Sequence, residues 1–339
     1  MPSLADPPKN NGMNQLTTFT ESNADSALPP GISVVVPVYN SEQTLRPLVV
    51  QIAELFRLRK TEFEIVLVND GSRDASWQQV VDLAKEFPHV RGFNLMRNFG
   101  QHNALLCGIR SARVDTIVTI DDDLQHPPEE IAKLLDKLNE GFDVVYGAPQ
   151  AAPHGILRNL ASKMTKFALQ AAMGAETARR VSAFRAFRTR LRNAFAAFAG
   201  SYVSIDVLLT WGTTRFTHVV VRHEPRTIGV SNYSVRKLIT HAFNMITGFS
   251  TVPLQAASLL GFALTGFGIL LMIFVITMYF VDRSAPAGFP FLASMIAIFS
   301  GAQLFSLGMI GEYLARVHFR LLDKPSYVAS EEVNGASAR

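Results

Sequence analysis

The chain has 339 residues, of which 48% are hydrophobic and 18% are charged, with a formal net charge of +4. The charged fraction is below the roughly 25% typical of soluble domains, so we expect part of the chain to lie in lipid. The single cysteine, Cys107, excludes a disulfide framework and a cysteine-based zinc site. The small surplus of Lys and Arg over Asp and Glu gives no reason to expect nucleic acid as a partner.

The N-terminal half predicts a disordered tail followed by an α/β domain. Residues 1–30 are polar and aperiodic and lack the apolar core of a secretory signal. From Gly31 to about Gly147, apolar runs alternate with helix-like stretches. The runs are Ile32–Tyr39, Phe63–Asn69, Val90–Leu95, Thr116–Ile120 and Asp143–Tyr146, and the stretches are Ser41–Leu58, Asp74–Phe87, Gln101–Ala112 and Pro128–Asn139. This alternation predicts a mostly parallel sheet covered on both faces.

The C-terminal third predicts two membrane-spanning helices. Leu254–Val281 and Ser284–Gly311 contain no charged residue, and each is longer than the roughly 20 residues that cross a bilayer. Two buried core helices are the alternative, but neither stretch has a polar face at helical spacing. We therefore expect a hairpin within residues 253–317, with spans at about 254–281 and 288–311, followed by a cytoplasmic tail over 318–339.

Basic residues predict how this hairpin is oriented. Arg236 and Lys237 precede it, and Arg316, Arg320 and Lys324 follow the second span. The positive-inside rule then places the α/β domain and the tail in the cytoplasm. Residues 235–252 carry one apolar face, which is typical of an interfacial helix and equally of a core helix. Small residues in the first span, such as Gly261, Gly266 and Gly268, are compatible with a homo-oligomer.

Acidic side chains follow three of the predicted strands. These segments are Pro37 to Glu42, Asn69 to Ser72, and Asp121-Asp122-Asp123-Leu-Gln125. Open α/β sheets bind ligands at the carboxyl ends of their strands. Three successive carboxylates repel one another, and a divalent cation such as Mg²⁺ or Mn²⁺ would offset that repulsion. Because such an ion is commonly shared with substrate phosphates, we expect a nucleotide diphosphate as the partner.

Glycine-rich phosphate loops are missing from the sequence, which argues against a P-loop NTPase or a dehydrogenase. Phosphate charge would then be met by the metal and by arginines. The candidate arginines are Arg97, Arg158, Arg185 and Arg226.

Several motifs in the expected order resemble those of family 2 GT-A glycosyltransferases. They are VVVPVYNSEQTL, VLVNDGSRDAS, MRNFGQHNALLCGI, TIDDDLQHPPEEI and GFDVVYGAPQ. NFGQHNAL, DDDLQHPPEE and GAQLFSLGMIGEYLARV further resemble the membrane-anchored polyprenyl-phosphate glycosyltransferases. That group includes dolichol-phosphate mannose synthase, undecaprenyl-phosphate 4-deoxy-4-formamido-L-arabinose transferases and O-antigen glucosyl-lipid synthases. The resemblance implies a GT-A domain over residues 31–234 and a place in the bacterial inner membrane.

The resemblance also implies roles for individual residues. Pro37, Tyr39, Glu42, Asp70 and Asp121 would bind the nucleotide. Asp121, Asp123 and Arg226 would be catalytic, with Asp123 as the direct metal ligand. Phosphate or acceptor contacts would come from Gln125, Arg158, Arg185, Arg226 and Ser231. One departure is Arg179-Arg180, which stand where relatives carry an acidic residue, so an acidic catalytic role there is in doubt.

The resemblance implies inverting transfer of a sugar from a nucleotide sugar to polyprenyl (undecaprenyl) phosphate. The expected nucleotide is UDP, and the product would serve the synthesis or modification of cell-envelope glycans.

Two alternative functions remain. A processive polysaccharide synthase usually carries a Gln-x-x-Arg-Trp motif, which neither Trp77 nor Trp211 fits. A non-catalytic membrane scaffold with a degenerate transferase domain is favoured only by Arg179-Arg180.

Overall fold

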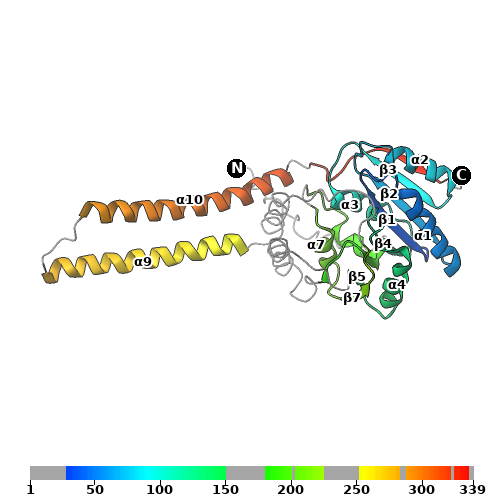
Figure 1. Cartoon of the computed structure of the whole chain (residues 1–339). Coiled ribbons are helices and arrows are strands. Elements are labelled where there is room, and N and C mark those ends of the chain that lie inside the picture. The colour runs from blue at the N-terminus through cyan, green and yellow to red at the C-terminus, as the bar shows by residue number, and fades with distance from the viewer. Residues whose placement is uncertain are drawn as a thin grey trace, which may run out of the picture.

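A computed structural model describes residues 28–149, 180–200, 203–224, 252–282, 288–321 and 324–335. It consists of an α/β domain from which two long helices extend side by side (Figure 1). Most of the predicted N-terminal tail, and the predicted interfacial helix up to its last residue, lie outside the described residues.

The domain is built on one eight-stranded sheet with the order β7-β5-β6-β4-β1-β2-β3-β8. Its strands are β1 (Ile32–Val38), β2 (Phe63–Asn69), β3 (Val90–Leu95), β4 (Thr116–Thr119), β5 (Val144–Pro149), β6 (Arg185–Arg188), β7 (Phe216–Val221) and β8 (Ala329–Asn334). The strands β3, β2, β1 and β4 are parallel, as predicted. However, β6 is antiparallel to β4 and β5, and β8 is antiparallel to β3. Because β5 and β7 are parallel to each other and run in the same direction as β4, only β6 and β8 oppose the other strands. The sheet is therefore mostly parallel, as predicted, with two antiparallel strands that make it mixed.

Helices cover both faces of the sheet, because the strands are apolar on both sides. Val34, Val36 and Val38 pack into a core with α1 (Leu45–Arg59), α2 (Ser76–Glu86) and α4 (Ile131–Asn139). The 3₁₀ turn η1 (Pro128–Glu130) lies beside α1. Val35 points to the opposite core, which contains α3 (Gln101–Ser111), the 3₁₀ helix η2 (Thr189–Phe195) and α7 (Ile205–Thr210). This period of two in β1 is what the continuous valine run requires for a strand buried on both faces.

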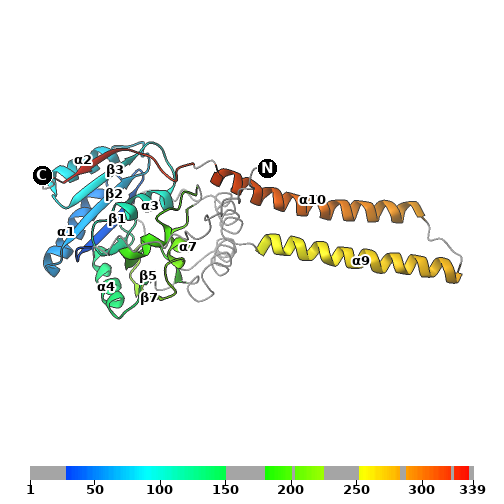
Figure 2. The ribbon, with the colours of Figure 1, turned by 180° about the vertical axis from the view of Figure 1, so that it is seen from behind.

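The two long helices are α9 (Val252–Asp282) and α10 (Gly288–Leu321), which lie side by side in both views (Figures 1 and 2). Gly268 of α9 lies against α10, since a Cβ atom there would come within 3.0 Å of the Phe299 ring. One candidate span is found within the described residues, Leu254–Met278, by its length and apolar composition. The predicted second span, and with it the multi-pass hairpin, is not confirmed by that test and stays a prediction.

Candidate active site

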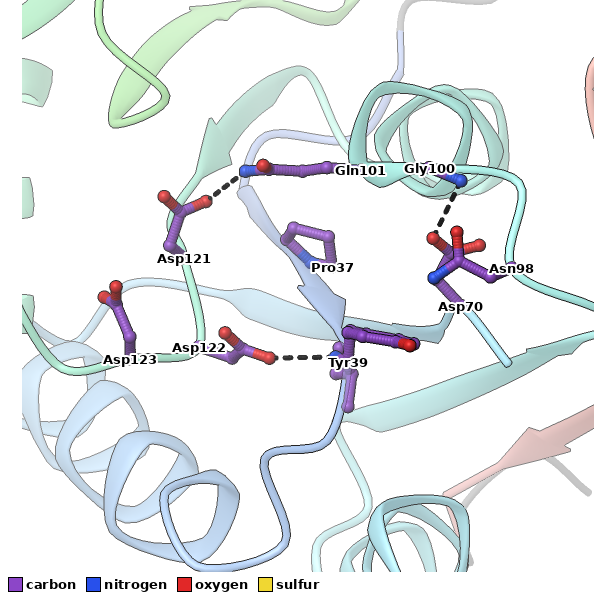
Figure 3. A pocket seen from close by; sticks show the side chains of 10 residues that line it. Pro37, Tyr39, Asp70, Asn98, Gly100, Gln101, Asp121, Asp122 and Asp123 are labelled. Carbon is purple, nitrogen blue, oxygen red and sulfur yellow. Dashed lines mark hydrogen bonds between the residues drawn. The ribbon is translucent and has the colours of Figure 1, made fainter. Parts of the chain in front are cut away.

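A pocket of about 260 Å³ opens at the carboxyl ends of β1, β2 and β4. It is lined by Pro37, Val38, Tyr39, Asp70, Asn98, Gly100, Gln101, Asp121, Asp122 and Asp123 (Figure 3). Parallel pairing brings the ends of these strands to one edge, as the register of Val38 opposite Asn69 shows. The structure thus brings together five of the predicted site residues, Pro37, Tyr39, Asp70, Asp121 and Asp123.

Asp70 both lines this pocket and holds one of its walls. The residue is 3% exposed at the end of β2. Its two carboxylate oxygens accept hydrogen bonds from the backbone N–H groups of Phe99 and Gly100, at 2.6 and 2.9 Å. Burial raises the pKa of Asp70, and the two N–H donors lower it in part. The carboxylate therefore fixes the loop between β3 and α3 against the end of β2.

Gly71 allows the close approach of that loop. Its φ is +65°, and a Cβ atom there would lie 2.6 Å from the backbone of both Arg97 and Asn98. Both the left-handed backbone and the close contact favour glycine.

We expect Gly71→Ala to lower the free energy of unfolding by about 1–3 kcal/mol, because the added methyl group meets backbone that cannot rotate away. Urea unfolding followed by tryptophan fluorescence measures this loss. Gly141→Ala is the matched control, because Gly141 has a φ of +101° but its Cβ would meet only the end of the Arg215 side chain, at 3.1 Å. Equal losses in the two variants would contradict a steric role for Gly71.

The three consecutive aspartates after β4 have different partners. Asp121 accepts a hydrogen bond from Gln101 Nε2 at 2.7 Å. Asp122 turns toward β1, where it accepts the Tyr39 N–H at 3.0 Å and the Ser41 hydroxyl (Figure 3). Asp123 accepts the Gln125 N–H at 3.2 Å. Burial raises the pKa of Asp122, and the bonds from Ser41 and Tyr39 lower it in part. Through these two bonds the carboxylate holds the loop after β1.

The turn after Asp123 is strained. Leu124 has a φ of +58°, a region that residues with a branched bulky side chain rarely adopt. Its side chain packs against the core beneath the sheet, which offsets the backbone cost. Such conformations cluster at functional sites, because the surrounding structure must hold them in place.

Three predicted site residues do not line this pocket. Glu42 does not line the pocket, and its carboxylate accepts the Ala75 N–H at 2.9 Å just before α2. Gln125 pairs with Glu224, whose N–H donates to the Gln125 carbonyl at 2.8 Å. Arg185 is only 1% exposed and forms an ion pair with Asp206. A guanidinium group enclosed in this way is not available to a phosphate in the pocket.

The remaining predicted phosphate-binding residues are Arg158, Arg226 and Ser231. All three lie outside the described residues. Arg179, which stands with Arg180 where relatives carry an acidic residue, lies outside them too. Arg97, also a candidate, lies over the Phe99 ring at 4.3 Å from the ring centroid.

Sequence reasoning missed one wall of the pocket, formed by Asn98, Gly100 and Gln101. These residues follow the carboxyl end of β3, so the rule that pointed to Asp70 and Asp121 applies to them equally. They carry no carboxylate, whereas the prediction from the sequence depended on acidic side chains that follow strands.

Comparisons with known proteins agree with this architecture. The model of Glycosyl transferase family 2 matches residues 33–195. An undecaprenyl-phosphate 4-deoxy-4-formamido-L-arabinose transferase from Pseudomonas fluorescens is 36% identical, with 87% of this chain and 88% of that protein covered. The protein of the same name from Yersinia enterocolitica is 33% identical, with 89% and 93% covered.

Solved structures also resemble the chain. The glucosyl-3-phosphoglycerate synthase of Mycobacterium tuberculosis, in complex with Mn²⁺, UDP and glucosyl-3-phosphoglycerate, is 18% identical with a TM-score of 0.48, covering 64% of this chain and 78% of that one. The family assignment rests on the two transferases, which match this chain over nearly their whole length at more than 30% identity. The chain is a glycosyltransferase, and it belongs to glycosyl transferase family 2.

Proposed function

We propose that this protein transfers a sugar from a nucleotide sugar to undecaprenyl phosphate, at the cytoplasmic face of a bacterial inner membrane. The observation that carries the proposal is the pocket at the carboxyl ends of β1, β2 and β4, in which Asp70, Asp121 and Asp123 converge in a family 2 transferase. The names of the two similar transferases support undecaprenyl phosphate as the acceptor.

The nucleotide occupies the part of the pocket between β1 and β3 in this proposal. Tyr39 is 39% exposed and offers a ring face against which a base can stack. Asp70 lines the same pocket and offers its carboxylate to a base or ribose hydrogen-bond donor. Gln101 and Asp121, joined by their hydrogen bond, border the same space.

The donor set fits a divalent cation. Asp121 and Asp123 provide hard carboxylate oxygens in one pocket, and Mg²⁺ is typically held by one or two carboxylates together with substrate phosphates. No group of three or more His, Cys, Asp or Glu side chains in the described part of the chain could hold an ion by itself, so the phosphates of the donor would complete its ligands. Bound Mg²⁺ or Mn²⁺ would neutralise charge on the leaving diphosphate.

The acceptor does not require a general base. A phosphate monoester has a second pKa near 6 and is already an anionic nucleophile at neutral pH. The phosphate oxygen attacks the anomeric carbon, a C–O bond forms there, and the bond to the nucleotide diphosphate breaks with its electron pair. Because the phosphate attacks from the face opposite to the leaving diphosphate, the configuration at the anomeric carbon is inverted. Reaction without a base is compatible with Arg179-Arg180 in place of an acidic residue.

The membrane helices bring the pocket to this acceptor in the proposal. We take both α9 and α10 to cross the bilayer, so that the acceptor's isoprenoid chain stays in lipid while its phosphate lies at the headgroup level. Both helices extend from the same side of the α/β domain (Figure 2).

The test is transfer in membranes that contain the protein. Undecaprenyl phosphate, Mg²⁺ or Mn²⁺ and a panel of UDP-sugars are added, and the sugar is followed into the lipid extract. We expect one donor to label the lipid and a metal chelator to stop the labelling. If no donor is transferred and none binds, the enzyme assignment of this site is wrong. If a donor is transferred to another acceptor, undecaprenyl phosphate is wrong.

A further inference from the structure

The C-terminal residues Ser326–Asn334, here called the C-terminal strap, connect the end of α10 to the edge of the sheet. The strap includes β8, which pairs with β3 from Leu95 opposite Ala329 to Arg91 opposite Asn334. In Figure 1 it runs along β3 toward the side of the domain opposite to the long helices. The C-terminal strap is therefore part of the sheet rather than a loose tail.

The strap is held by side chains along its whole length. At its start, the Ser326 hydroxyl donates to the Gly200 carbonyl at 2.9 Å. In the middle, the Trp77 indole N–H donates to Glu331 at 2.8 Å. Near its end, Arg91, whose side chain is 8% exposed, donates to Glu332 and to Asn334, both at 3.1 Å. Charge-assisted bonds to a nearly buried guanidinium group make this a firm attachment.

The sequence of β3 leaves room for the strap. A Cβ atom on Gly92 would lie 2.8 Å from Val333 and 2.3 Å from Val80, so only glycine lets Val333 pack onto the core at that point. Without β8, β3 would also be an unpaired strand at the sheet edge, because its other partner is β2.

The strap also reaches the wall of the nucleotide pocket. The Met96 N–H donates to the Val328 carbonyl at 2.9 Å, which fixes the start of the loop that leads to Asn98 and Gly100. The Tyr327 ring lies 5.9 Å from the Arg110 guanidinium of α3. The strap therefore holds β3 and α3, the two elements on either side of the pocket wall that binds Asp70.

The chain between α10 and the strap is short. The helix ends at Leu321 and the first strap contact is made by Ser326, five residues later, so this connection spans at most about 18 Å. The antiparallel register places the start of β8 beside the carboxyl end of β3, which is the pocket edge of the sheet. A short tether thus joins the end of a long apolar hairpin to the edge of the sheet that carries the pocket.

We propose that the C-terminal strap is a positioning element that fixes the height and tilt of the sugar-donor pocket relative to the membrane end of α10. This inference rests on the proposed function for its catalytic consequence, since an acceptor phosphate confined to the headgroup level can be reached only from a defined height. The height and tilt of the pocket can be measured without any sugar transfer.

The test lengthens the tether and leaves the strap in place. About six Gly and Ser residues inserted after Lys324 add about 20 Å of reach while Ser326–Asn334 can still pair with β3. The matched control carries the same insert after Gly335, beyond the strap. Pocket height is read by energy transfer from a dye on Arg73→Cys, an exposed position whose N–H binds Asn40 near the pocket, to dyes on lipid headgroups. Cys107 is only 2% exposed, and this burial also raises the pKa of its thiol to about 12, so we expect the native cysteine not to compete for the label.

We expect the insert after Lys324 to lower the energy transfer and to broaden its distribution, and the control insert to leave both unchanged. We also expect sugar transfer to undecaprenyl phosphate in vesicles to fall about tenfold or more, because a misplacement of even about 1 Å at the reacting atoms can cost about 100-fold. Transfer to a short-chain, water-soluble polyprenyl phosphate should be retained, which shows that the domain is folded.

Unchanged energy transfer, or an equal change with the control insert, would overturn the positioning role. A reduced energy transfer with full activity on the membrane acceptor would likewise overturn the catalytic part of the proposal. If the unmodified protein transfers no sugar, the proposed function fails, and the energy-transfer comparison alone decides the role of the strap.

Discussion

Asp123→Asn is expected to lower the rate of sugar transfer by about 10²-fold or more, with little change in protein stability. The substitution keeps the shape of the side chain and removes the charge that we assign to the metal and the leaving diphosphate. Loss of one electrostatic contact to charge that develops in the transition state typically costs this much. Steady-state transfer to undecaprenyl phosphate at saturating donor measures the effect, and raising the Mn²⁺ concentration should restore part of the rate.

The adjacent Asp122 provides the control for this prediction. Asp122→Asn makes the same chemical change one residue earlier, but the Asp122 carboxylate is engaged with the Tyr39 N–H and the Ser41 hydroxyl. An amide oxygen can accept both bonds, so we expect a far smaller loss of rate and no dependence on the metal concentration. A larger loss in Asp122→Asn than in Asp123→Asn would show that the roles are exchanged.

Arg185→Met should lower the free energy of unfolding of the α/β domain by about 3–5 kcal/mol, the range found when one partner of a buried ion pair is removed. Arg185 donates to Asp206 and, at 3.2 Å, to the Thr119 hydroxyl, and the buried Tyr146 hydroxyl lies 3.2 Å from the same Asp206 carboxylate. Without the guanidinium group, that carboxylate stays inside the domain with no compensating charge. Urea unfolding followed by tryptophan fluorescence is a suitable measurement, because Trp77 and Trp211 both lie in this domain.

The double variant Arg185→Met/Asp206→Leu separates burial of charge from loss of packing. It removes both charges and keeps apolar volume, and we expect it to recover most of the lost stability. If the double variant is as unstable as Arg185→Met, the cost arises from packing around the arginine. An intact stability in Arg185→Met, with lost phosphate binding, would favour the role that the sequence first suggested for Arg185.

Local sequence patterns determined the first half of the α/β domain. The continuous apolar runs at β1, β2 and β3 predicted strands whose bounds agree with the structure to within one residue. The position of Asp70 and of Asp121–Asp123 directly after such runs was enough to predict that they would share one pocket, because parallel strands end at a common edge. The absence of charge in Leu254–Val281 likewise predicted a long helix, and α9 covers it.

Tertiary structure decided what depends on partners that are distant in the chain. Strand β8 carries two glutamates, and no periodicity indicates that it joins a sheet, yet Arg91 and Trp77 supply its partners from more than 230 residues away. Arg185 looks like a phosphate ligand in the sequence, but Asp206 from α7 encloses it. Glu42 lies outside the pocket and Asp122 lines it, and both hold loops because their carboxylates accept backbone N–H groups of other segments. A sequence records which side chains can bind a charge, and only the fold determines which charge lies within reach.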